Sequence, residues 1–375
     1  MIKIAFITTG LSRGGAERML LKLLSAIDRT KFEPAIFCLT QNLSLMPEIE
    51  TLGVRVHSYK FNSPIFCIFS LISFIRDCQK FAPDILQGWM YHGNVFASIA
   101  RCFVSSKVSF GIRVALYNFN YERLLTRYII RLGAKLSQQA DKIIYVSHVA
   151  QTHHESVGYS GQTAIVIPNG FDLIRFQPNE SQRQEYRQRL QLSDDTIAVG
   201  YFARFHKMKG HVDLIHAFAD VSARHPTAKL ILAGAQIDER NHALTEVIRT
   251  HRLDKKVILL GELSCPERVL PALDIFVSPS HQEGFPNVVG EAMACGLACV
   301  VTDVGDSALA VGDTGIVVPS QNPQGLGAAI NQMINEHQMI DWGIRARQRV
   351  ETEFELSVIV KKYEKVYKDL MAEKS

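Results

Sequence analysis

Two carboxylates stand around the start of one short helix in the second half of the sequence. Glu283 follows an apolar strand, and Glu291 comes after seven intervening residues, inside a helix that begins at Pro286 and ends at Gly296. Helical side chains lean toward the helix N-terminus, so Glu291 is expected near the same opening as Glu283. The backbone amides of residues 287–289 are expected to point into this opening as well. Such amides attract phosphate, and carboxylates accept hydrogen bonds from hydroxyl groups, so the stretch favours a sugar attached to a phosphate.

Two cations follow an apolar strand earlier in the same half. Arg204 comes directly after the strand, and Lys209 lies in the basic loop before the next helix. A planar guanidinium and a mobile ammonium can bracket a diphosphate. A lysine-rich surface loop without a ligand is the alternative interpretation.

The first half has two glycines and a histidine at strand ends. Gly14 and Gly15 lie between the first strand and its helix, where they allow backbone approach to a ligand, although a tight turn would explain them almost as well. His92 lies at the strand edge where open parallel sheets bind ligands, although an isolated histidine is more often structural. Three other histidines have the spacing of neither a zinc helix nor a catalytic pair, and a helix surface is expected for them: His148, His153 and His154.

Short apolar runs alternate with amphipathic segments in both halves of the chain. The runs predict strands at residues 2–9, 34–40, 54–59, 85–90, 108–113, 142–147 and 164–168, and then at 197–203, 229–235, 257–261, 275–278, 298–302 and 316–319. This alternation predicts parallel sheets covered by helices on both faces. A polar stretch, residues 169–195, is interpreted as a hinge and the first helix after it.

Length and composition indicate a globular protein of two domains. The chain has 375 residues, of which 47% are hydrophobic and 21% charged. Seven cysteines, without a CxxC pair, indicate reduced thiols in a cytoplasm rather than disulfides or a metal site. The first residues lead directly into a strand, so no signal peptide is expected.

The net charge of +4 is unevenly distributed. Residues 85–140 hold seven basic side chains and one acidic side chain, and four of the basic ones recur at every fourth position beside Leu and Tyr: Arg123, Arg127, Arg131 and Lys135. This spacing predicts a basic amphipathic helix. Its basic face is either simply solvated or attracted to anionic lipid headgroups or a phosphate-bearing acceptor, and Arg113 is a further candidate for that contact. The small net charge and the lack of a binding motif argue against nucleic acid.

Taken together, these motifs resemble glycosyltransferase family 4. The resemblance rests on residues 283–287 with Glu291, on Arg204 with Lys209, on the Gly14-Gly15 turn, and on the sequence IPNGFD at 167–172 before Phe176. Residues 89–94 and 303–306 resemble bacterial members that build surface polysaccharides, such as capsule or lipopolysaccharide, or lipid-linked glycans.

The resemblance implies the GT-B fold, an α/β architecture of two Rossmann-like domains, each a doubly wound parallel sheet, which face a cleft. Residues 1–172 would form an acceptor-binding domain and residues 173–354 a nucleotide-sugar-binding domain. The last helix, at 355–375, would cross back onto the first domain.

The resemblance also implies a retaining, metal-independent hexosyl or N-acetylhexosaminyl transfer without a cofactor. The donor would be a nucleotide-diphosphate sugar, with UDP expected over GDP, and the acceptor a glycan or a polyprenyl-diphosphate-linked glycan. Glu283 would bind sugar hydroxyls, Glu291 the ribose, and Arg204 with Lys209 the diphosphate. The catalytic residues would be His92, Glu283, Arg204 and Lys209, and the donor-binding residues Gly14, Gly15, Arg204, Lys209, Gly284, Phe285, Asn287, Val288 and Glu291. Pro286 replaces a glycine found in many members and removes one N–H donor.

Two other functions are compatible with this set of residues. One is an enzyme of another class on the same architecture, such as a nucleotide-sugar epimerase, or a glycosidase using two carboxylates, although a glycosidase would leave Arg204 and Lys209 without a phosphate. The other is a non-catalytic protein that binds a nucleotide sugar. The expected location is the cytoplasm, with Arg113, Arg123, Arg127 and Arg131 as candidates for peripheral contact with the anionic inner membrane.

Overall fold

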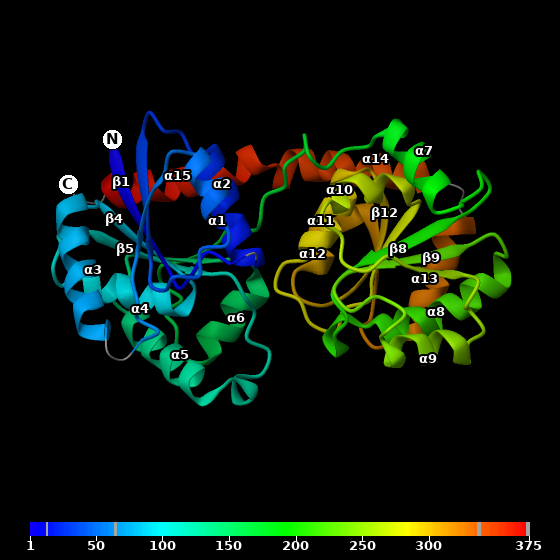
Figure 1. The fold of residues 1–375 in the computed structure, drawn as a ribbon, viewed down its shortest axis with the longest axis horizontal. Helices are drawn as coiled ribbons and strands as arrows, with labels where there is room; N and C mark the ends of the chain where they lie inside the picture. The colour runs from blue at the N-terminus through cyan, green and yellow to red at the C-terminus, as the bar shows by residue number, and fades with distance from the viewer. Residues whose placement is uncertain (13, 64–65, 336–338, 373–375) are drawn as a thin grey trace. The chain divides into compact units, whose positions relative to one another are not determined.

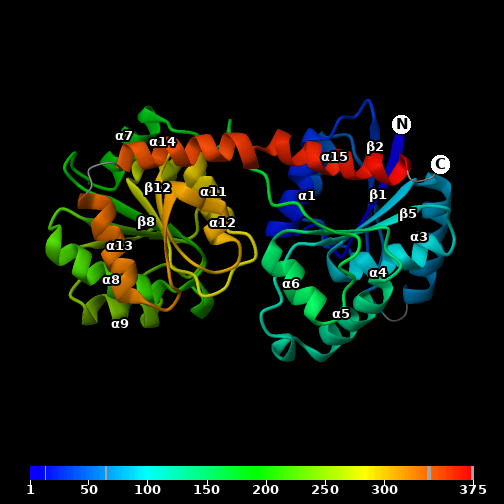
Figure 2. The same cartoon turned by 180° about the vertical axis from the view of Figure 1, so that it is seen from behind.

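The chain folds into two compact units. The computed structural model describes residues 1–12, 14–63, 66–335 and 339–372, and it separates Met1–Gly170 with Leu356–Ser375 (unit 1) from Phe171–Glu355 (unit 2). The divisions expected from the sequence lay after residues 172 and 354. Each unit is one parallel sheet with helices on both faces, which confirms the predicted α/β class (Figures 1 and 2).

Unit 1 contains a seven-stranded sheet of order β3-β2-β1-β4-β5-β6-β7 in which every neighbouring pair is parallel. Its strands are β1 (Ile2–Thr8), β2 (Phe32–Cys38), β3 (Arg55–Ser58), β4 (Ile85–Trp89), β5 (Lys107–Ile112), β6 (Lys142–Tyr145) and β7 (Ala164–Val166). β1 and β4 are buried along nearly their whole length because helices cover both faces, so they read as continuous apolar runs. Each predicted strand of the first half is present: five are one or two residues shorter than their apolar runs, and β2 and β5 have the predicted length but begin two residues and one residue earlier.

The helices of unit 1 connect these strands, and the last one comes from the end of the chain. They are α1 (Gly15–Ala26), α2 (Met46–Thr51), α3 (Cys67–Phe81), α4 (Met90–Arg101), α5 (Leu124–Ser137), α6 (His148–Ser156) and α15 (Leu356–Ala372). α15 packs against α1 on one face of the sheet. None of the described helices is both long and apolar enough to cross a bilayer.

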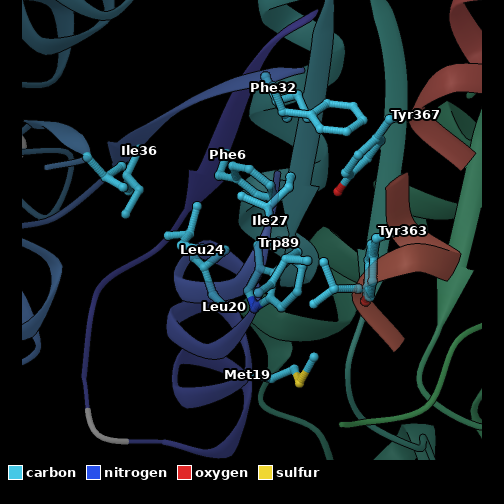
Figure 3. Close-up of a cluster of buried hydrophobic side chains, with 14 of the residues drawn as sticks. Phe6, Met19, Leu20, Leu24, Ile27, Phe32, Ile36, Trp89, Tyr363 and Tyr367 are labelled. Carbon is cyan, nitrogen blue, oxygen red and sulfur yellow. The ribbon is translucent and has the colours of Figure 1, made fainter. Parts of the chain in front are cut away.

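The core of unit 1 depends on α15. Tyr363 and Tyr367 of α15 point into the cluster around Phe6, Phe32 and Trp89 (Figure 3). The Tyr367 ring centroid lies 6.4 Å from that of Phe6 and 6.1 Å from that of Phe32, and Tyr363 lies 6.3 Å from Trp89. Because the tyrosines are fully buried, their hydroxyl groups need partners: Tyr367 donates to Gln87 Oε1 at 3.2 Å. The C-terminal helix therefore completes the core of the first unit.

Unit 2 repeats the plan with a six-stranded parallel sheet of order β10-β9-β8-β11-β12-β13. Its strands are β8 (Ala198–Phe202), β9 (Lys229–Ala233), β10 (Val257–Leu259), β11 (Ile275–Ser278), β12 (Ala298–Thr302) and β13 (Gly315–Val318), all at predicted positions.

The helices of unit 2 lie on both faces of its sheet (Figure 1). They are α7 (Glu180–Arg189), α8 (His211–Arg224), α9 (His242–Thr250), α10 (Pro266–Val269), α11 (Asn287–Ala294), α12 (Ser307–Val311), α13 (Pro323–Asn335) and α14 (Met339–Arg349).

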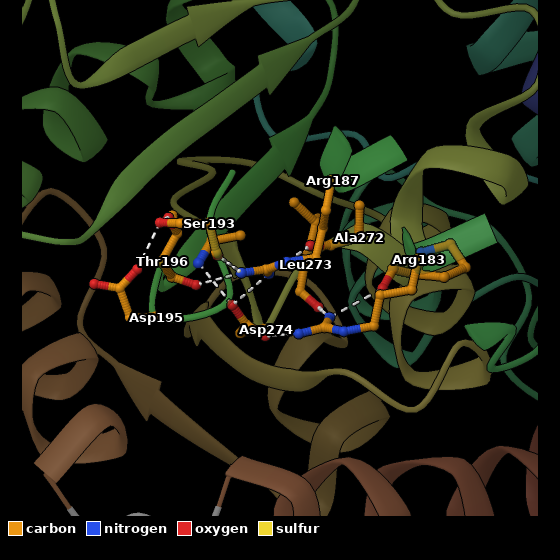
Figure 4. Close-up of polar contacts among 10 residues, drawn as sticks. Arg183, Arg187, Ser193, Asp195, Thr196, Ala272, Leu273 and Asp274 are labelled. Atoms are coloured by element: carbon orange, nitrogen blue, oxygen red, sulfur yellow. Dashed lines mark hydrogen bonds and ion pairs between the residues drawn. The ribbon is translucent and has the colours of Figure 1, made fainter. Parts of the chain in front are cut away.

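The helix predicted after the hinge, α7, is bound firmly to unit 2. Arg183 and Arg187 both form ion pairs with Asp274, at 2.6 and 3.3 Å, and Arg187 also donates to the carbonyls of Ser193 and Thr196 (Figure 4). Asp274 Oδ2 accepts a third bond, from the backbone N–H of Ala198 at 2.7 Å. This network holds α7 against the amino ends of β8 and β11, so α7 is part of unit 2.

Candidate active site

The predicted cations and carboxylates of unit 2 lie in the segments that follow two neighbouring strands, β8 and β11. β8 pairs with both β9 and β11, so the strand order reverses direction there, and ligands of open parallel sheets bind at the carboxyl ends of such strands. Arg204 follows β8, and Glu283 follows β11. The topology therefore brings together groups that are far apart in the sequence.

Glu283 is held by a chain of polar contacts. Its Oε1 forms an ion pair with Lys209 Nζ at 2.5 Å and accepts a hydrogen bond from Ser280 Oγ at 2.8 Å. The Tyr201 hydroxyl lies 3.0 Å from Ser280 Oγ and donates to it, because the serine proton is already directed at Glu283. Burial raises the pKa of Tyr201, which keeps it a donor. Glu283 is thus fixed in place, with its side chain largely shielded from water.

The start of α11 differs in detail from the sequence prediction. Pro286 was expected at the first helical position, but it precedes the helix as the cap residue, and α11 begins at Asn287. The Val289 N–H was expected to point toward a ligand, but it donates to the Pro286 carbonyl at 3.1 Å. The amides of Asn287 and Val288 are then the ones at the helix start.

Phe285 is a packing residue of unit 2. Its ring is buried, with its centroid 6.3 Å from the ring of Phe171 and 5.5 Å from that of Phe354. Phe171 also closes over Gly290 of α11, where an added Cβ would lie 2.0 Å from the ring. The IPNGFD motif therefore supports the site helix through its phenylalanine, and a ligand could use only the backbone of Phe285.

A cavity of about 320 Å³ opens beside α11. Of the predicted site residues it is lined by Arg204, Val288 and Glu291; its other walls are Phe202, Ala203, Ala233, Gly234, Ala235, Glu262, Leu263, Pro266, Leu270 and Phe276. The walls are mainly apolar with a few charged groups, which is typical of a small-molecule site. Glu283 and Lys209 are absent from this lining, so the two glutamates have different surroundings.

Glycines allow the loops of the site to approach one another. Gly305 has φ +58°, and a Cβ there would lie 2.4 Å from the Glu283 carbonyl oxygen, while Asp306 N–H donates to the Gly284 carbonyl at 3.1 Å. Gly210 has φ +66°, and a Cβ would lie 2.0 Å from the Pro279 carbonyl oxygen. Only glycine combines this backbone conformation with such close contact.

His92 occupies the equivalent switch point of unit 1, between β1 and β4. β4 turns into α4 through Met90, whose φ of +67° is unusual for a non-glycine residue. Gly93 then packs so closely that a Cβ would lie 2.0 Å from the Ile7 carbonyl oxygen. This sharp junction places His92 at the carboxyl edge of the sheet, where burial lowers its pKa and favours the neutral imidazole.

The Gly14-Gly15 turn follows β1 at the same switch point. Gly14 caps α1 and Gly15 is its first residue. Glu17 lies in the first turn of α1, where its carboxylate accepts a hydrogen bond from Ser12 Oγ at 3.0 Å. A carboxylate at a helix start offsets the attraction of that start for phosphate, so this turn is better suited to hydroxyl groups than the sequence suggested.

Comparison with known proteins gives the same assignment for both units. Residues 13–175 match the family model described as Glycosyltransferase Family 4, and residues 196–336 match the model described as Glycosyl transferases group 1; between them these matches cover most of the chain. The chain belongs to glycosyltransferase family 4.

Relatives of this family 4 chain include bacterial surface-polysaccharide enzymes. The N,N'-diacetylbacillosaminyl-diphospho-undecaprenol alpha-1,3-N-acetylgalactosaminyltransferase of Campylobacter jejuni is 24% identical over 95% of this chain and 97% of its own. The capsular polysaccharide biosynthesis glycosyltransferase CapM of Staphylococcus aureus is 28% identical over 55% of this chain and 54% of its own. The solved structure of Alr3699/HepE from Anabaena in complex with UDP superposes with a TM-score of 0.86 at 22% identity, covering 98% and 100% of the two chains, which establishes the GT-B fold.

Arg113 has internal contacts in this glycosyltransferase. Its guanidinium donates to the Tyr363 hydroxyl at 2.8 Å, to the Ile167 carbonyl at 3.1 Å and to Asn169 Oδ1, and it lies 5.4 Å from the Trp89 ring. These contacts tie α15 to the ends of β5 and β7. They favour a structural role for Arg113 over the acceptor or membrane contact that was expected.

The basic helix and one of the three other histidines also depart from the sequence interpretation. α5 begins at Leu124, with Arg123 as its cap, and Leu124 and Tyr128 beside the arginines face water instead of the core. His154, expected on a helix surface, is fully buried: its Nδ1–H donates to the Ala150 carbonyl at 2.7 Å, and its Nε2 lies 2.9 Å from the Tyr91 hydroxyl.

Sequence reasoning missed the supporting groups of the family 4 site. Ser280 lies three residues before Glu283, and Tyr201 lies three residues before Arg204, so both were within the motifs that were examined. Their role depends on the contact between β8, which holds Tyr201, and the segment after β11, which holds Ser280, and spacing along the sequence does not reveal that contact. In the described part of the chain, no group of three or more His, Cys, Asp or Glu side chains is arranged to hold a metal ion.

Proposed function

We propose that this glycosyltransferase moves a sugar from a UDP-sugar to a glycan or lipid-linked acceptor in bacterial surface-polysaccharide synthesis, with retention of anomeric configuration. The observation that carries the proposal is the set of groups around α11: the Lys209–Glu283 ion pair and the cavity lined by Arg204 and Glu291. Two cations suit a diphosphate, and two carboxylates suit two sets of hydroxyl groups.

The two glutamates would read different parts of the donor. Glu291 lines the cavity, so it would accept hydrogen bonds from the ribose hydroxyls of a nucleotide bound there. Glu283 lies outside that lining and would accept from the hydroxyls of the transferred sugar. The choice of UDP over GDP is supported by the UDP bound in the Anabaena structure, and the sugar is of the hexosyl or N-acetylhexosaminyl class.

The proposed chemistry is stabilised by charges already in place. As the bond between the anomeric carbon and the phosphate oxygen breaks, negative charge develops on the leaving diphosphate. Arg204, Lys209 and the amides of Asn287 and Val288 would stabilise that charge more in the transition state than in the ground state. On this account a metal ion or cofactor is not required.

His92 would act on the sugar side of the reaction. Its imidazole is mainly neutral at pH 7 because burial lowers its pKa, so it can donate or accept a hydrogen bond without adding a positive charge. Retention requires the acceptor oxygen to bond to the anomeric carbon on the face that the diphosphate leaves, with the acceptor proton released. Unit 1 would bind this acceptor and unit 2 the nucleotide.

The proposed acceptor places the enzyme at the cytoplasmic face of a membrane. The Campylobacter relative is named for a diphospho-undecaprenol acceptor, and α5 carries exposed basic side chains here. The seven cysteines are all free thiols, as suits a reducing compartment.

A nucleotide-sugar epimerase and a non-catalytic binding protein are the competing functions, and one experiment separates them. The protein is incubated with UDP-N-acetylglucosamine or UDP-glucose, with and without a polyprenyl-diphosphate-linked glycan, and both UDP and the sugar nucleotide are quantified. Acceptor-dependent release of UDP is expected. Isomerisation of the donor without acceptor would indicate an epimerase, and binding without turnover would indicate a non-catalytic protein.

A further inference from the structure

The first turns of α3 present large apolar side chains to water. Ile68, Phe69 and Ile72 are 58–71% exposed, and Phe66, just before the helix, is 46% exposed. Ile72 is four residues after Ile68 and three after Phe69, so it neighbours both on the helix surface, and the three side chains form one stripe. The opposite side of α3 is buried in the unit 1 core through Phe74 and other residues, so the exposed stripe is additional to the packing that holds the helix.

α5 presents a second stripe of the same kind. Leu124, Leu125 and Tyr128 are 67–70% exposed, and Leu132 is exposed as well. The buried side of this helix is made of Ile130, Gly133, Ala134 and Ser137. Apart from Ile130 the buried side consists of small residues, and most of the large apolar side chains face outward, which is the reverse of an ordinary amphipathic helix packed on its own domain.

The two stripes lie on one face of unit 1 and begin at one edge of its sheet. α3 connects β3 to β4 and α5 connects β5 to β6, so both connections run across the sheet in the same direction, and right-handed connections place both helices on the same face. α4 lies between them: Phe96 of α4 contacts Phe61 and Phe74 on one side, and α4 packs on α5 on the other (Figures 1 and 2). Each helix belongs to the connection that leaves the carboxyl end of a parallel strand, β3 for α3 and β5 for α5, so both start toward the carboxyl edge.

The charges around the stripes are mainly positive, with Glu122, just before Arg123, as an acidic neighbour. Lys60 Nζ lies 5.3 Å from the Phe66 ring, and Arg123, Arg131 and Lys135 are exposed around the α5 stripe. The first turns of α3 and α5 contain no acidic residue. Apolar side chains bordered by cations match an anionic bilayer, where the apolar groups enter the acyl boundary and the cations contact the headgroups.

We propose that α3 and α5 form a two-helix surface that inserts shallowly into an anionic bilayer, with α3 supplying mainly apolar insertion and α5 both insertion and charge. The exposed apolar area is larger than singly scattered surface residues would give. The inference rests on the proposed function only in naming a membrane-bound acceptor, and binding to lipid is measured separately from transfer.

Vesicle binding by the full-length protein tests the proposal. Phosphatidylcholine vesicles are compared with vesicles that also contain phosphatidylglycerol, at low and high salt. F69S/I72S is expected to bind the anionic vesicles at least about tenfold more weakly at both salt concentrations, because insertion is lost. R123E/R127E/R131E is expected to lose binding chiefly at low salt, because screening already weakens the charge contribution at high salt. I340S is the matched control, since Ile340 is a highly exposed residue of unit 2.

A dye at Cys67 reports insertion directly. Only Cys67, Cys102 and Cys265 are exposed among the seven cysteines, so C102S/C265S leaves Cys67, the first residue of α3, as the accessible thiol. A polarity-sensitive dye there is expected to report an apolar environment with anionic vesicles and to be quenched by lipid-borne quenchers. The same dye on Cys265, in C67S/C102S, is expected to stay in water.

Three results would overturn the proposal. The first is that F69S/I72S binds vesicles as tightly as the wild type. The second is that the Cys67 dye stays in an aqueous environment when the protein is bound to vesicles. The third is that the protein forms a dimer in solution that F69S/I72S dissociates, which would make the stripe a self-association surface. UDP affinity and transfer to a water-soluble acceptor are measured in parallel. If a variant loses vesicle binding but keeps UDP affinity and transfer, only the membrane surface is affected. If the wild type itself shows neither UDP binding nor transfer, the proposed function is wrong.

Discussion

At the scale of single residues, the contacts of Glu283 are the most specific feature of the site. A carboxylate that accepts from both Lys209 and Ser280 has little freedom to rotate, so it presents its remaining acceptor positions in fixed directions. Fixed acceptors need no rearrangement when charge develops in a reaction. Ser280 and Tyr201 are therefore positioning residues that act through Glu283.

The variant S280A tests this positioning role. It removes a hydrogen bond to Glu283 and leaves the buried Tyr201 hydroxyl without its acceptor, so the free energy of unfolding should fall by about 1–3 kcal/mol. Turnover should fall more than UDP affinity does. In a double-mutant cycle with Y201F, measured by kcat and by denaturant unfolding, the two effects should be non-additive because the residues belong to one network. Unchanged kcat in S280A would remove Ser280 from the account.

His92 gives a second prediction, on turnover and its pH dependence. H92A should lower kcat by about a hundredfold, as loss of one fixed hydrogen-bonding group does, with UDP affinity unchanged. Because burial lowers the pKa of His92, the neutral form should persist below the ordinary value of 6.5, and the wild-type acid limb of kcat should lie below pH 6.5. H242A, at an exposed position of unit 2, is the control. An acid limb that is identical in H92A would contradict the role.

At the scale of elements, the loop before α11 depends on the loop before α12. G305A forces a side chain into a backbone with φ +58° and against the Glu283 carbonyl, which should cost about 1–3 kcal/mol in stability. It should also displace Glu283, and a shift of about 1 Å can lower turnover by on the order of a hundredfold.

G53A is the matched control for G305A. Gly53 has φ +64°, but nothing lies within 4 Å of a Cβ placed there, so it carries the backbone strain without the collision. Its unfolding free energy should fall while kcat and donor affinity stay at wild-type values. Equal kinetic effects of the two substitutions would mean that the contact between the loops is irrelevant to the site.

The elements themselves could be predicted from the sequence, and most of their contacts could not. Apolar runs marked the buried strands, because buried parallel strands have no polar alternation, and Arg204 and Glu283 could be placed at strand ends. The Lys209–Glu283 ion pair, the burial of His154 and the outward leucines of α5 depend on which helix packs on which strand. Local periodicity contains no information on that choice, so the sequence was compatible with Leu124 facing either the core or water.

At the scale of the whole molecule, the chain passes between its two units twice, after Gly170 and after Glu355. The second passage delivers α15, and with it Tyr363 and Tyr367, to the core of unit 1. The core of unit 1 is therefore incomplete until α15 has been made. The groups proposed to bind the nucleotide diphosphate, Arg204, Lys209 and Glu291, lie in unit 2, so the stability of unit 1 and the binding of UDP should respond to different substitutions.

The variant Y363F tests this division. It removes the acceptor that the Arg113 guanidinium uses at 2.8 Å, and a buried donor left unpaired should destabilise unit 1 by about 1–3 kcal/mol. UDP affinity should be unchanged, as measured by calorimetry beside denaturant unfolding followed by unit-specific hydrogen exchange. Y128F, at an exposed tyrosine of α5, should alter neither quantity. Weaker UDP binding in Y363F would show that the units are coupled more strongly than this account allows.

If unit 2 binds the nucleotide diphosphate through the groups around α11, substitutions of those groups must weaken the binding of UDP. Calorimetry is carried out on the wild type, K209A and E291A, with K207A, an exposed lysine of the same loop, as the control. Loss of a charged hydrogen bond should weaken binding of UDP by about 10- to 100-fold in K209A and E291A, while K207A keeps the wild-type Kd. Wild-type affinity for UDP in both K209A and E291A would contradict the account.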